Sequence, residues 1–172
     1  MIDRTRASAL RLLALDVDGV LTDGRLYYGN SGEELKAFNI KDGLGLKLLQ
    51  RAGVAVAIIT GRRSQIVERR AAELGIAHVV QGREDKRVAL EELCATLGID
   101  LGQCAYMGDD LPDLGALRAA AIGLAPADAV DAVAAAADWQ SRYAGGAGCV
   151  REACEQLLHA MDRREAIEAD YR

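Results

Sequence analysis

The sequence lacks the features that mark several large classes of protein. It has no excess of positive charge, because 21 lysine and arginine residues stand against 26 aspartate and glutamate residues, a net charge of -5. This balance argues against broad nucleic-acid binding. The apolar run before Asp16 is too short and too soon followed by acid for a signal peptide or a membrane span. No proline- or glycine-rich linker, internal repeat or low-complexity block beyond the alanines divides the chain.

Cysteines are few and are not arranged for metal binding. There are four, with no CxxC spacing and no histidines placed beside them like zinc ligands. We therefore expect reduced thiols packed in the core of a cytoplasmic protein. These cysteines are Cys94, Cys104, Cys149 and Cys154.

What the sequence does have is enough apolar material for one domain. The chain has 172 residues, of which 51% are hydrophobic, so a single packed domain over residues 1–172 is expected. Apolar runs of strand length alternate with helical patterns, which predicts an α/β fold with a Rossmann-like, doubly wound parallel sheet covered by helices on both faces. The expected strands are 12–15, 54–59, 78–80, 104–107 and 121–124, and the expected helices are 42–53, 64–74, 86–97, 130–136 and 150–161.

One segment departs from this alternation, directly after the first strand. Residues 26–28 and 35–38 are predicted to form two short strands, joined by the turn residues Gly29 to Gly32. The segment 26–38 is thus expected to be a β-hairpin insertion. Since a lone hairpin is only marginally stable, we expect it to pair with something else, such as another subunit.

Acidic residues directly follow the first apolar strand. Asp16 comes straight after the run Leu12–Leu15, and Asp18 lies two residues further on. A buried strand that ends in carboxylates is costly unless the acids leave the core there. Asp16 is therefore expected at the carboxyl end of its strand, where open α/β sheets place their ligand crevice. Asp18 is near enough to serve the same site.

Three later strands are also followed by polar side chains, Thr60, Lys86 and Asp109. The carboxyl ends of parallel strands meet at one edge of a sheet, so these groups are expected to converge. Carboxylates can hold Mg²⁺, and the metal, Lys86 and Thr60 can neutralise and position a phosphoryl group. In this interpretation Asp16 attacks phosphorus to form an aspartyl-phosphate. Asp18 protonates the leaving alcohol and then activates water.

The order of these motifs resembles that of the haloacid dehalogenase-like phosphohydrolases over nearly the whole chain. DVDGVLTDG (16–24) is similar to their first motif, Thr60 to their second, Lys86 to their third and GDDLPD (108–113) to their fourth. The resemblance implies that Asp16 is the nucleophile and Asp18 the general acid/base.

The same resemblance implies a metal site and its surroundings. Mg²⁺ would be bound by the Asp16 carboxylate, the Asp18 backbone carbonyl and the Asp109 carboxylate. Residues implied to support the site from nearby are Gly61, Asp110 and Asp113.

The superfamily divides by its cap domain, and this chain has no room for one. Only the hairpin and one helix separate the first two motifs, and one helix separates the second from the third. A capless member leaves its site open and takes its lid from a neighbour in an oligomer.

Finer features resemble one family within the superfamily, the phosphatases of 3-deoxy-D-manno-octulosonate 8-phosphate (KDO 8-phosphate), which serve lipopolysaccharide precursor synthesis. The matching stretches are FNIKDGLG (38–45), IITGRRSQIVERR (58–70), QGREDK (81–86) and GGAGCVRE (145–152). A sugar acid phosphate carries both a carboxylate and a phosphate, so a site ringed by cations is electrostatically suitable. The residues implied to bind the substrate are Asp18, Asn39, Ile40, Lys41, Asp42, Gly43, Lys47, Arg62, Arg70 and Lys86.

The resemblance to this family also implies a homotetramer, with the hairpins packed around its centre, and a glycine-rich loop that is a movable lid. Gly145, Gly146 and Gly148, with Arg151, would reach a neighbour's active site. Within the C-terminal region 143–172, the segment 143–148 is expected to be flexible, and the charged end from 162 is expected to fray. Truncation before Gly145 is expected to leave the fold intact while altering turnover or product release.

One departure and three alternative functions stay open at this point. Gln140 stands, between Trp139 and Ser141, where the family tends to have a small aliphatic residue, which indicates either a variant sugar specificity or merely a different contact. The substrate could instead be a nine-carbon, sialic-type sugar acid phosphate. A receiver-like domain, which keeps its aspartyl-phosphate as a switch, would release no free phosphate. A purely structural relative would be expected to have lost the acids that this chain keeps.

Overall fold

A six-stranded parallel sheet forms the centre of the computed structural model, which describes residues 1–171 and leaves Arg172 outside the described part. The strand order is β5–β4–β1–β6–β7–β8. The predicted sheet is confirmed, and it has one additional edge strand, β8, that the sequence analysis missed. The strands are β1 (Leu12–Leu15), β4 (Ala55–Thr60), β5 (His78–Gln81), β6 (Cys104–Met107), β7 (Ile122–Ala125) and β8 (Trp139–Gln140).

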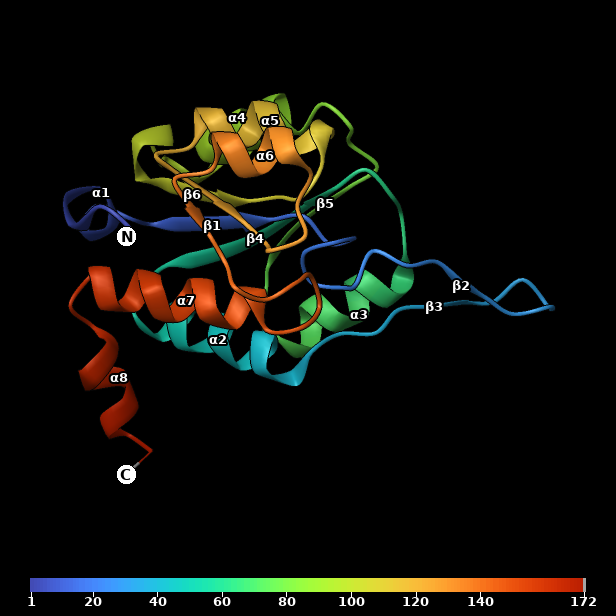
Figure 1. The fold of residues 1–172 in the computed structure, drawn as a ribbon, viewed down its shortest axis with the longest axis horizontal. Helices are drawn as coiled ribbons and strands as arrows, with labels where there is room; N and C mark the ends of the chain where they lie inside the picture. Colours follow the sequence, from blue (N-terminus) through green and yellow to red (C-terminus); the bar gives the residue numbers. More distant parts are fainter. Residues whose placement is uncertain (172) are drawn as a thin grey trace.

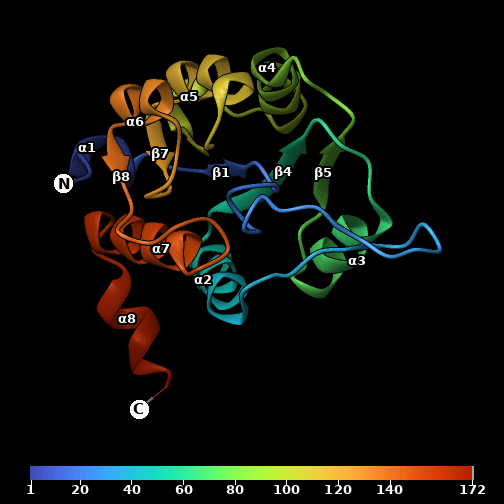
Figure 2. The same cartoon turned by 45° about the vertical axis from the view of Figure 1, so that its right-hand side comes forward.

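Helices cover both faces of the sheet, as predicted (Figures 1 and 2). The layer below the sheet in Figure 1 contains α2 (Ile40–Arg51), α3 (Gln65–Glu73) and α7 (Cys149–Ala160). The layer above it contains α4 (Lys86–Leu97), α5 (Leu114–Ala119) and α6 (Asp131–Ala136). The remaining short helices are α1 (Arg4–Ser8), α8 (Arg164–Ala169) and the 3₁₀ turns η1 (Leu101–Gln103) and η2 (Leu111–Asp113). Within residues 1–171, no helix combines the length and apolarity that crossing a membrane requires.

The apolar run of the central strand β1 is continuous because both faces of this strand are buried. All four of its residues are buried, because the strand has a helical layer on each side. Leu13 and Leu15 belong to the core on the α2 and α7 side, whereas Leu12 and Ala14 belong to the core on the α4 and α5 side. With β4 and β6 paired on its two edges, β1 is fixed in register, and so is the residue that follows it.

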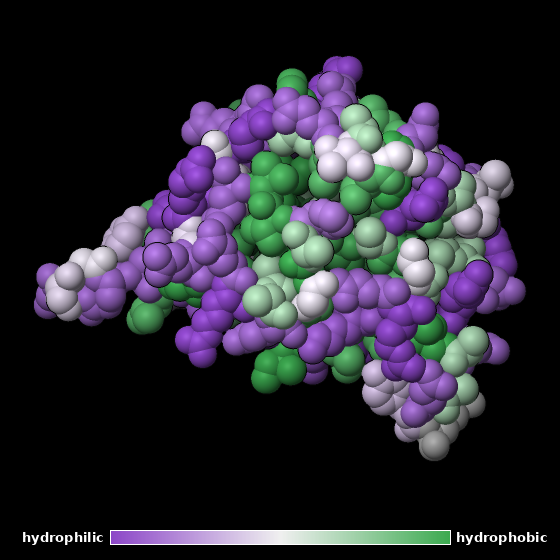
Figure 3. Space-filling view, turned by 180° about the vertical axis from the view of Figure 1, so that it is seen from behind, coloured by the Kyte–Doolittle hydropathy of each residue, from purple (hydrophilic) through white to green (hydrophobic). Residues whose placement is uncertain are grey.

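The hairpin forms, but it is shorter than predicted. Its strands are β2 (Tyr27–Tyr28) and β3 (Glu34–Leu35), paired antiparallel. The prediction of a second strand over 35–38 was therefore wrong beyond Leu35, and Lys36 begins a segment outside the strand. Figures 1 and 3 show this arm standing clear of the body.

The C-terminal region is more ordered than the sequence analysis expected. Residues 164–169, which were expected to fray, form α8. Helix α7 packs along α2, and eight of its twelve residues are buried, including Val150 and Leu157. Truncation before Gly145 would remove this helix and expose the core on that face of the sheet. The expectation that such a truncation leaves the fold intact was therefore wrong.

All four cysteines are buried free thiols, as predicted. Those of α4 and β6 lie side by side, with 3.2 Å between the Sγ atoms of Cys94 and Cys104. Burial raises the pKa of the Cys104 thiol far above its ordinary value. These thiols therefore act as small apolar groups in the core.

Candidate active site

The carboxyl ends of β1, β4 and β6 bring the predicted polar groups to one edge of the sheet. Asp16 directly follows β1 and is 6% exposed, and Thr60 ends β4 at 2% exposed. Lys86, at the first position of α4, places its Nζ 3.0 Å from Asp16 Oδ1. Oxygen atoms of Asp16, Asp109 and Asp113 all lie within 4.8 Å of one another. The predicted convergence is confirmed for Asp16, Lys86 and Asp109, whereas the part of Thr60 in this cluster stays a prediction.

Asp113 fixes the position of Lys86 and of the loop that carries Asp109. Its Oδ1 accepts hydrogen bonds from Lys86 Nζ and from Tyr106 Oη, each at 2.7 Å. Its Oδ2 accepts from the backbone N–H groups of Asp109 (3.1 Å) and Asp110 (3.2 Å). Four donors saturate the carboxylate, so Asp113 holds the site together without being free to bind a ligand. This agrees with the supporting position predicted for it.

Lys86 is charged although it is buried. Burial lowers the pKa of its ammonium, but the carboxylates of Asp16 and Asp113 outweigh burial and raise it. A buried ammonium is tolerated when carboxylates satisfy it in this way. Lys86 thus supplies one fixed positive charge to a cluster of three acids.

The residual negative charge of the cluster fits a divalent cation. Burial and the charge of Asp113 raise the pKa of Asp16 to about 7. Burial, followed by the charges of Asp16 and Asp113, raises the pKa of Asp109 to about 7 as well. Asp109 Oδ1 is buried and has no hydrogen-bond partner among the described residues. A hard cation such as Mg²⁺ prefers such oxygen ligands, so the Asp16 and Asp109 carboxylates would hold it.

Gly19 allows the loop after β1 to lie directly against Asp109. Its φ of +94° is in the left-handed region, and a Cβ placed on it would come within 2.1 Å of Asp109 Oδ2. Only glycine meets both requirements. The glycine of the DVDG motif is therefore explained by its close approach to Asp109, an acid of the cluster.

Asp18 lies outside the acidic cluster, in a ring of alternating charges. Its carboxylate forms an ion pair with Lys36 Nζ, and Lys36 Nζ also lies 3.5 Å from Glu34 Oε1. Arg62 closes the ring, with Nη2 at 3.0 Å from Glu34 Oε1 and Nε at 3.9 Å from Asp18 Oδ2. Asp18 and Arg62 were predicted as site residues from the sequence, whereas Glu34 and Lys36 were not. The only available signal was their alternating charge at the base of the hairpin.

Several predicted substrate-binding residues gather at the start of α2. Asn39 caps this helix, since its Oδ1 accepts a hydrogen bond from the N–H of Lys41 at 2.8 Å. The Arg70 guanidinium lies beside this cap, 3.5 Å from the Asn39 carbonyl. A Cβ on Gly43 would come within 2.4 Å of the guanidinium, so this glycine makes room for Arg70. Ile40 next to them is 84% exposed.

Two predicted substrate-binding residues do not join this group. Asp42 is 1% exposed, and its Oδ1 accepts a hydrogen bond from the N–H of Arg151 at 2.7 Å, at the N-terminus of α7. Its charge therefore stabilises α7, which corrects its assignment as a ligand contact. Lys47 lies about two turns further along α2 and lines a different surface cavity, together with Arg51 and Gly75. The structure does not bring Lys47 to the acids.

The glycine-rich loop packs against the active-site loop of its own chain. Gly146 N–H donates to the Val20 carbonyl at 3.0 Å, and a Cβ on Gly145 would come within 2.0 Å of the Gly19 carbonyl. The Asn39 amide also donates to the Gly146 carbonyl at 3.3 Å. The loop is thus held between the Asp16–Gly24 segment and α2. Its action as a lid on a neighbouring subunit stays a prediction.

Gln140 makes a structural contact. Its Nε2 donates to the carbonyls of Pro126 (3.1 Å) and Ala127 (3.3 Å), which follow β7. The neighbouring Ser141 donates to Glu152 of α7 at 2.6 Å. Of the two interpretations of Gln140, the structure favours a different contact over a changed sugar specificity.

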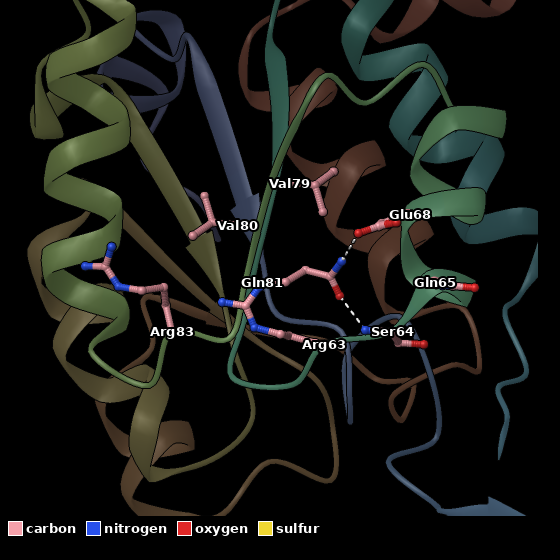
Figure 4. Close-up of a pocket in the computed structure, with 8 residues that line it drawn as sticks. All are labelled: Arg63, Ser64, Gln65, Glu68, Val79, Val80, Gln81 and Arg83. Carbon is pink, nitrogen blue, oxygen red and sulfur yellow. Dashed lines mark hydrogen bonds between the residues drawn. The ribbon is translucent and has the colours of Figure 1, made fainter. Parts of the chain in front are cut away.

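A surface pocket of about 600 Å³ lies beside this site, along the edge strand β5. Figure 4 shows Gln81 bridging it, with Oε1 accepting from the Ser64 N–H at 2.8 Å and Nε2 donating to Glu68 at 3.0 Å. The pocket is lined by residues of the β4–α3 loop, α3, β5 and the segment after β5, and none of the clustered acids faces it. The bridge attaches the loop after Thr60 to the edge of the sheet.

Comparison with known proteins agrees with this geometry. The model of the haloacid dehalogenase-like hydrolase family matches residues 40–121. The 3-deoxy-D-manno-octulosonate 8-phosphate phosphatase KdsC of Yersinia pestis is 49% identical over 160 residues, 93% of this chain and 86% of that protein. KdsC of Escherichia coli K12 is 47% identical over 158 residues, 92% of this chain and 84% of that protein.

Solved structures give the same result. The phosphatase of the same name from Moraxella catarrhalis, in complex with magnesium ion, phosphate ion and KDO, superimposes with a TM-score of 0.96 at 46% identity, covering 98% of this chain and 97% of that one. The cobalt-bound form of the Haemophilus influenzae phosphatase superimposes with a TM-score of 0.90 at 39% identity, covering 94% of each chain. The chain belongs to the family of 3-deoxy-D-manno-octulosonate 8-phosphate phosphatases, within the haloacid dehalogenase-like hydrolases.

Proposed function

We propose that this protein is a Mg²⁺-dependent phosphatase that hydrolyses KDO 8-phosphate to the free sugar acid and phosphate, in lipopolysaccharide precursor synthesis. The single observation that carries the proposal is the cluster of Asp16, Asp109 and Asp113 around the ammonium of Lys86. The names of relatives 46–49% identical over nearly the whole chain supply the substrate. The magnesium ion of the Moraxella catarrhalis structure agrees with the hard cation that the clustered acids, with the unpartnered Oδ1 of Asp109, favour.

The chemistry follows from the positions of the side chains. An Asp16 carboxylate oxygen attacks phosphorus, the bond to the sugar oxygen breaks, and an aspartyl-phosphate forms. Asp18 gives its proton to the leaving sugar oxygen, and then takes a proton from the water that hydrolyses the aspartyl-phosphate. Lys86 remains beside Asp16 and offsets the charge of the phosphoryl oxygens. Mg²⁺, when bound, supplies further positive charge that stabilises the transferring group.

The substrate needs cations at two places, because its phosphate and its carboxylate lie at opposite ends of the molecule. Lys86 serves the phosphate. Arg62, at the mouth of the site beside Asp18, and Arg70, beside Asn39, are the cations proposed for the sugar acid. Lys41 and Ile40 start the same helix and are exposed there, where a ligand can contact them.

The hairpin supports the proposal of a homotetramer. Its apolar side chains are exposed in the single chain, with Tyr28 at 65%, Leu35 at 62% and Leu26 at 49%. Clustered apolar exposure of this kind is typical of a surface that another chain covers. The buried free thiols support a cytoplasmic location, where thiols stay reduced.

Phosphate release from a panel of sugar acid phosphates with Mg²⁺ tests the proposal. KDO 8-phosphate is expected to give the highest kcat/KM, and a nine-carbon sugar acid phosphate a lower one. Asp16→Asn is expected to abolish release, because an amide cannot form the acyl-phosphate. A higher kcat/KM for the nine-carbon compound would overturn the substrate assignment. Substantial activity of Asp16→Asn would overturn the mechanism, as would a long-lived phosphoenzyme without phosphate release.

A further inference from the structure

The base of the hairpin enters the active site through one side chain. Lys36 follows β3, and its side chain is only 2% exposed although a lysine is normally solvated. Its ammonium contacts Asp18 Oδ1 and lies 3.5 Å from Glu34 Oε1. A nearly dehydrated ammonium requires such partners. Lys36 is therefore fixed by the acids of the site and of the hairpin.

The two oxygens of the Asp18 carboxylate are not equivalent. Lys36 contacts Oδ1. Arg62 Nε is 3.9 Å from Oδ2, which is longer than a hydrogen bond. Oδ2 is thus the oxygen that neither cation holds by a hydrogen bond.

The second cation of the ring is fixed from the hairpin as well. A hydrogen bond to Tyr28 and the nearby carboxylates of Glu34 and Asp18 raise the pKa of the Arg62 guanidinium. Tyr28 and Glu34 are cross-strand neighbours in β2 and β3. Both strands of the hairpin therefore contact the groups that surround Asp18.

We propose that Lys36 is a positioning residue for the proposed general acid/base: by binding Oδ1 it fixes the orientation of Asp18 and aims Oδ2 at the leaving oxygen. The inference rests on the proposed function for the role of Asp18. It also makes the hairpin part of the active site in addition to an assembly surface. The position of Asp18 then depends on how the hairpin is seated.

The dependence on the leaving group separates positioning from a general structural role. A sugar alkoxide must be protonated as it leaves, whereas p-nitrophenolate leaves without a proton. In Lys36→Met the rate of the first turnover on KDO 8-phosphate is expected to fall about 10²-fold. The first turnover on p-nitrophenyl phosphate, measured as the burst of p-nitrophenolate, is expected to change less than about threefold. Lys36→Arg, which keeps the charge, is expected to recover most of the loss.

Arg25→Met is the matched control, because Arg25 is an exposed cation of the same segment outside the ring. It should leave both rates unchanged, and circular dichroism and molecular mass should show that all variants are folded and assembled alike. Equal losses on the two substrates, or no loss on either, would overturn the positioning role of Lys36.

The failure of the proposed function can be recognised separately. If the wild-type protein does not act on KDO 8-phosphate, the substrate assignment fails, and phenyl phosphate then takes its place as the poor leaving group. A loss in Lys36→Met that is larger on phenyl phosphate than on p-nitrophenyl phosphate would still support the positioning role. Wild-type protein that acts on none of these esters would overturn both proposals.

Discussion

Two regions of the active site are held in different ways. The nucleophile region of Asp16, Lys86 and Asp113 is part of the core, and these side chains are 9%, 5% and 1% exposed. The acid/base region around Asp18 is built from loops and the hairpin, and side chains there are as much as 42% exposed, as in Arg62. The acids of the first region follow β1 and β6, which are paired on both edges, and Lys86 follows the edge strand β5. The second depends on a hairpin whose two strands have two residues each.

Because of this difference, substitutions in the hairpin should affect the two chemical steps of the proposed mechanism unequally. Phosphoryl transfer to Asp16 depends on groups that the core fixes in place, so changes in the arm should affect it little. Proton transfer by Asp18 depends on the seating of the arm, so changes there should affect alcohol leaving groups and assembly together. In the proposed mechanism, this capless enzyme obtains its nucleophile from its own core and the placement of its general acid from its surface.

The strongest test of the core region is Gly19→Ala. The Cβ of an alanine at this position would come within 2.1 Å of Asp109 Oδ2, and the alanine would have to adopt the positive φ of Gly19. Displacement of the Asp109 carboxylate by about 1 Å is expected to lower kcat about 10²-fold and to weaken Mg²⁺ binding. Both effects can be measured by titrating Mg²⁺ in the phosphate-release assay. Gly53→Ala is the control, because its φ is +89° but nothing lies within 4 Å of its Cβ. Gly53→Ala should cost about 1 kcal/mol of stability and leave the Mg²⁺ titration unchanged. An unchanged titration in Gly19→Ala would contradict the close approach.

When a chelator removes divalent cations, the uncompensated charges of the acidic cluster are expected to lower the free energy of unfolding. The pKa values of Asp16 and Asp109 are raised from 3.8 to about 7 in the folded state. The folded chain therefore binds more protons than the unfolded chain in this window. Stability should fall as the pH rises from about 4 to about 7 and then level off.

Asp16→Asn removes one of these charges. At pH 8 without metal, its free energy of unfolding should exceed that of the wild type by on the order of 1–2 kcal/mol. It should therefore unfold at a higher temperature. Asp18→Asn, from the other region, should be less stable than wild type because it loses its ion pairs with Lys36 and Arg62. Thermal unfolding of the three proteins checks both directions. Equal stabilisation by both substitutions would remove the distinction between the regions.

The arm is tested by Leu35→Asp, which places a charge on its exposed apolar surface. Sedimentation should show a smaller assembly than the wild type. Because Lys36 is the next residue, the first turnover on KDO 8-phosphate should fall about tenfold, with little change on p-nitrophenyl phosphate. A control substitution of the turn, Ser31→Ala, should preserve the assembly. Unchanged mass in Leu35→Asp would contradict the assignment of this surface to assembly.

The smallest effect is expected for Gln140→Ala, which affects neither region. The lost hydrogen bonds to Pro126 and Ala127 should cost about 1 kcal/mol of stability. The ratio of kcat/KM for eight- and nine-carbon sugar acid phosphates should not change. A changed ratio would show that Gln140 affects sugar specificity and would contradict its assignment as a structural contact.

The core region could be predicted from the sequence because its position follows from the sheet. Asp16, Lys86 and Asp109 each come just after an apolar strand or at the helix that follows it, and parallel strands end at one edge. The bounds of β6 and α4 were predicted to the residue for the same reason, since strong apolar patterns and clear turns define them.

The arm and the long-range contacts could not be predicted in this way. No periodic pattern indicates that Lys36, after a two-residue strand, turns back to Asp18. Asp42 lies in a segment that resembles a substrate site, yet its partner is an N–H group 109 positions away. The burial of α7 against α2 is likewise a tertiary contact, so the prediction that this helix can be removed without loss of the fold was wrong.

The division of labour between Asp16 and Asp18 is tested most directly by trapping the phosphoenzyme. Asp18→Asn, mixed with p-nitrophenyl phosphate and Mg²⁺ and quenched in acid, should carry one phosphoryl group per chain, located on the peptide that contains Asp16. Transfer needs no proton for this leaving group, whereas hydrolysis of the intermediate lacks its base. Asp16→Asn under the same conditions should carry none. A phosphoryl group on another residue, or a burst of p-nitrophenolate with no phosphoenzyme, would contradict the account.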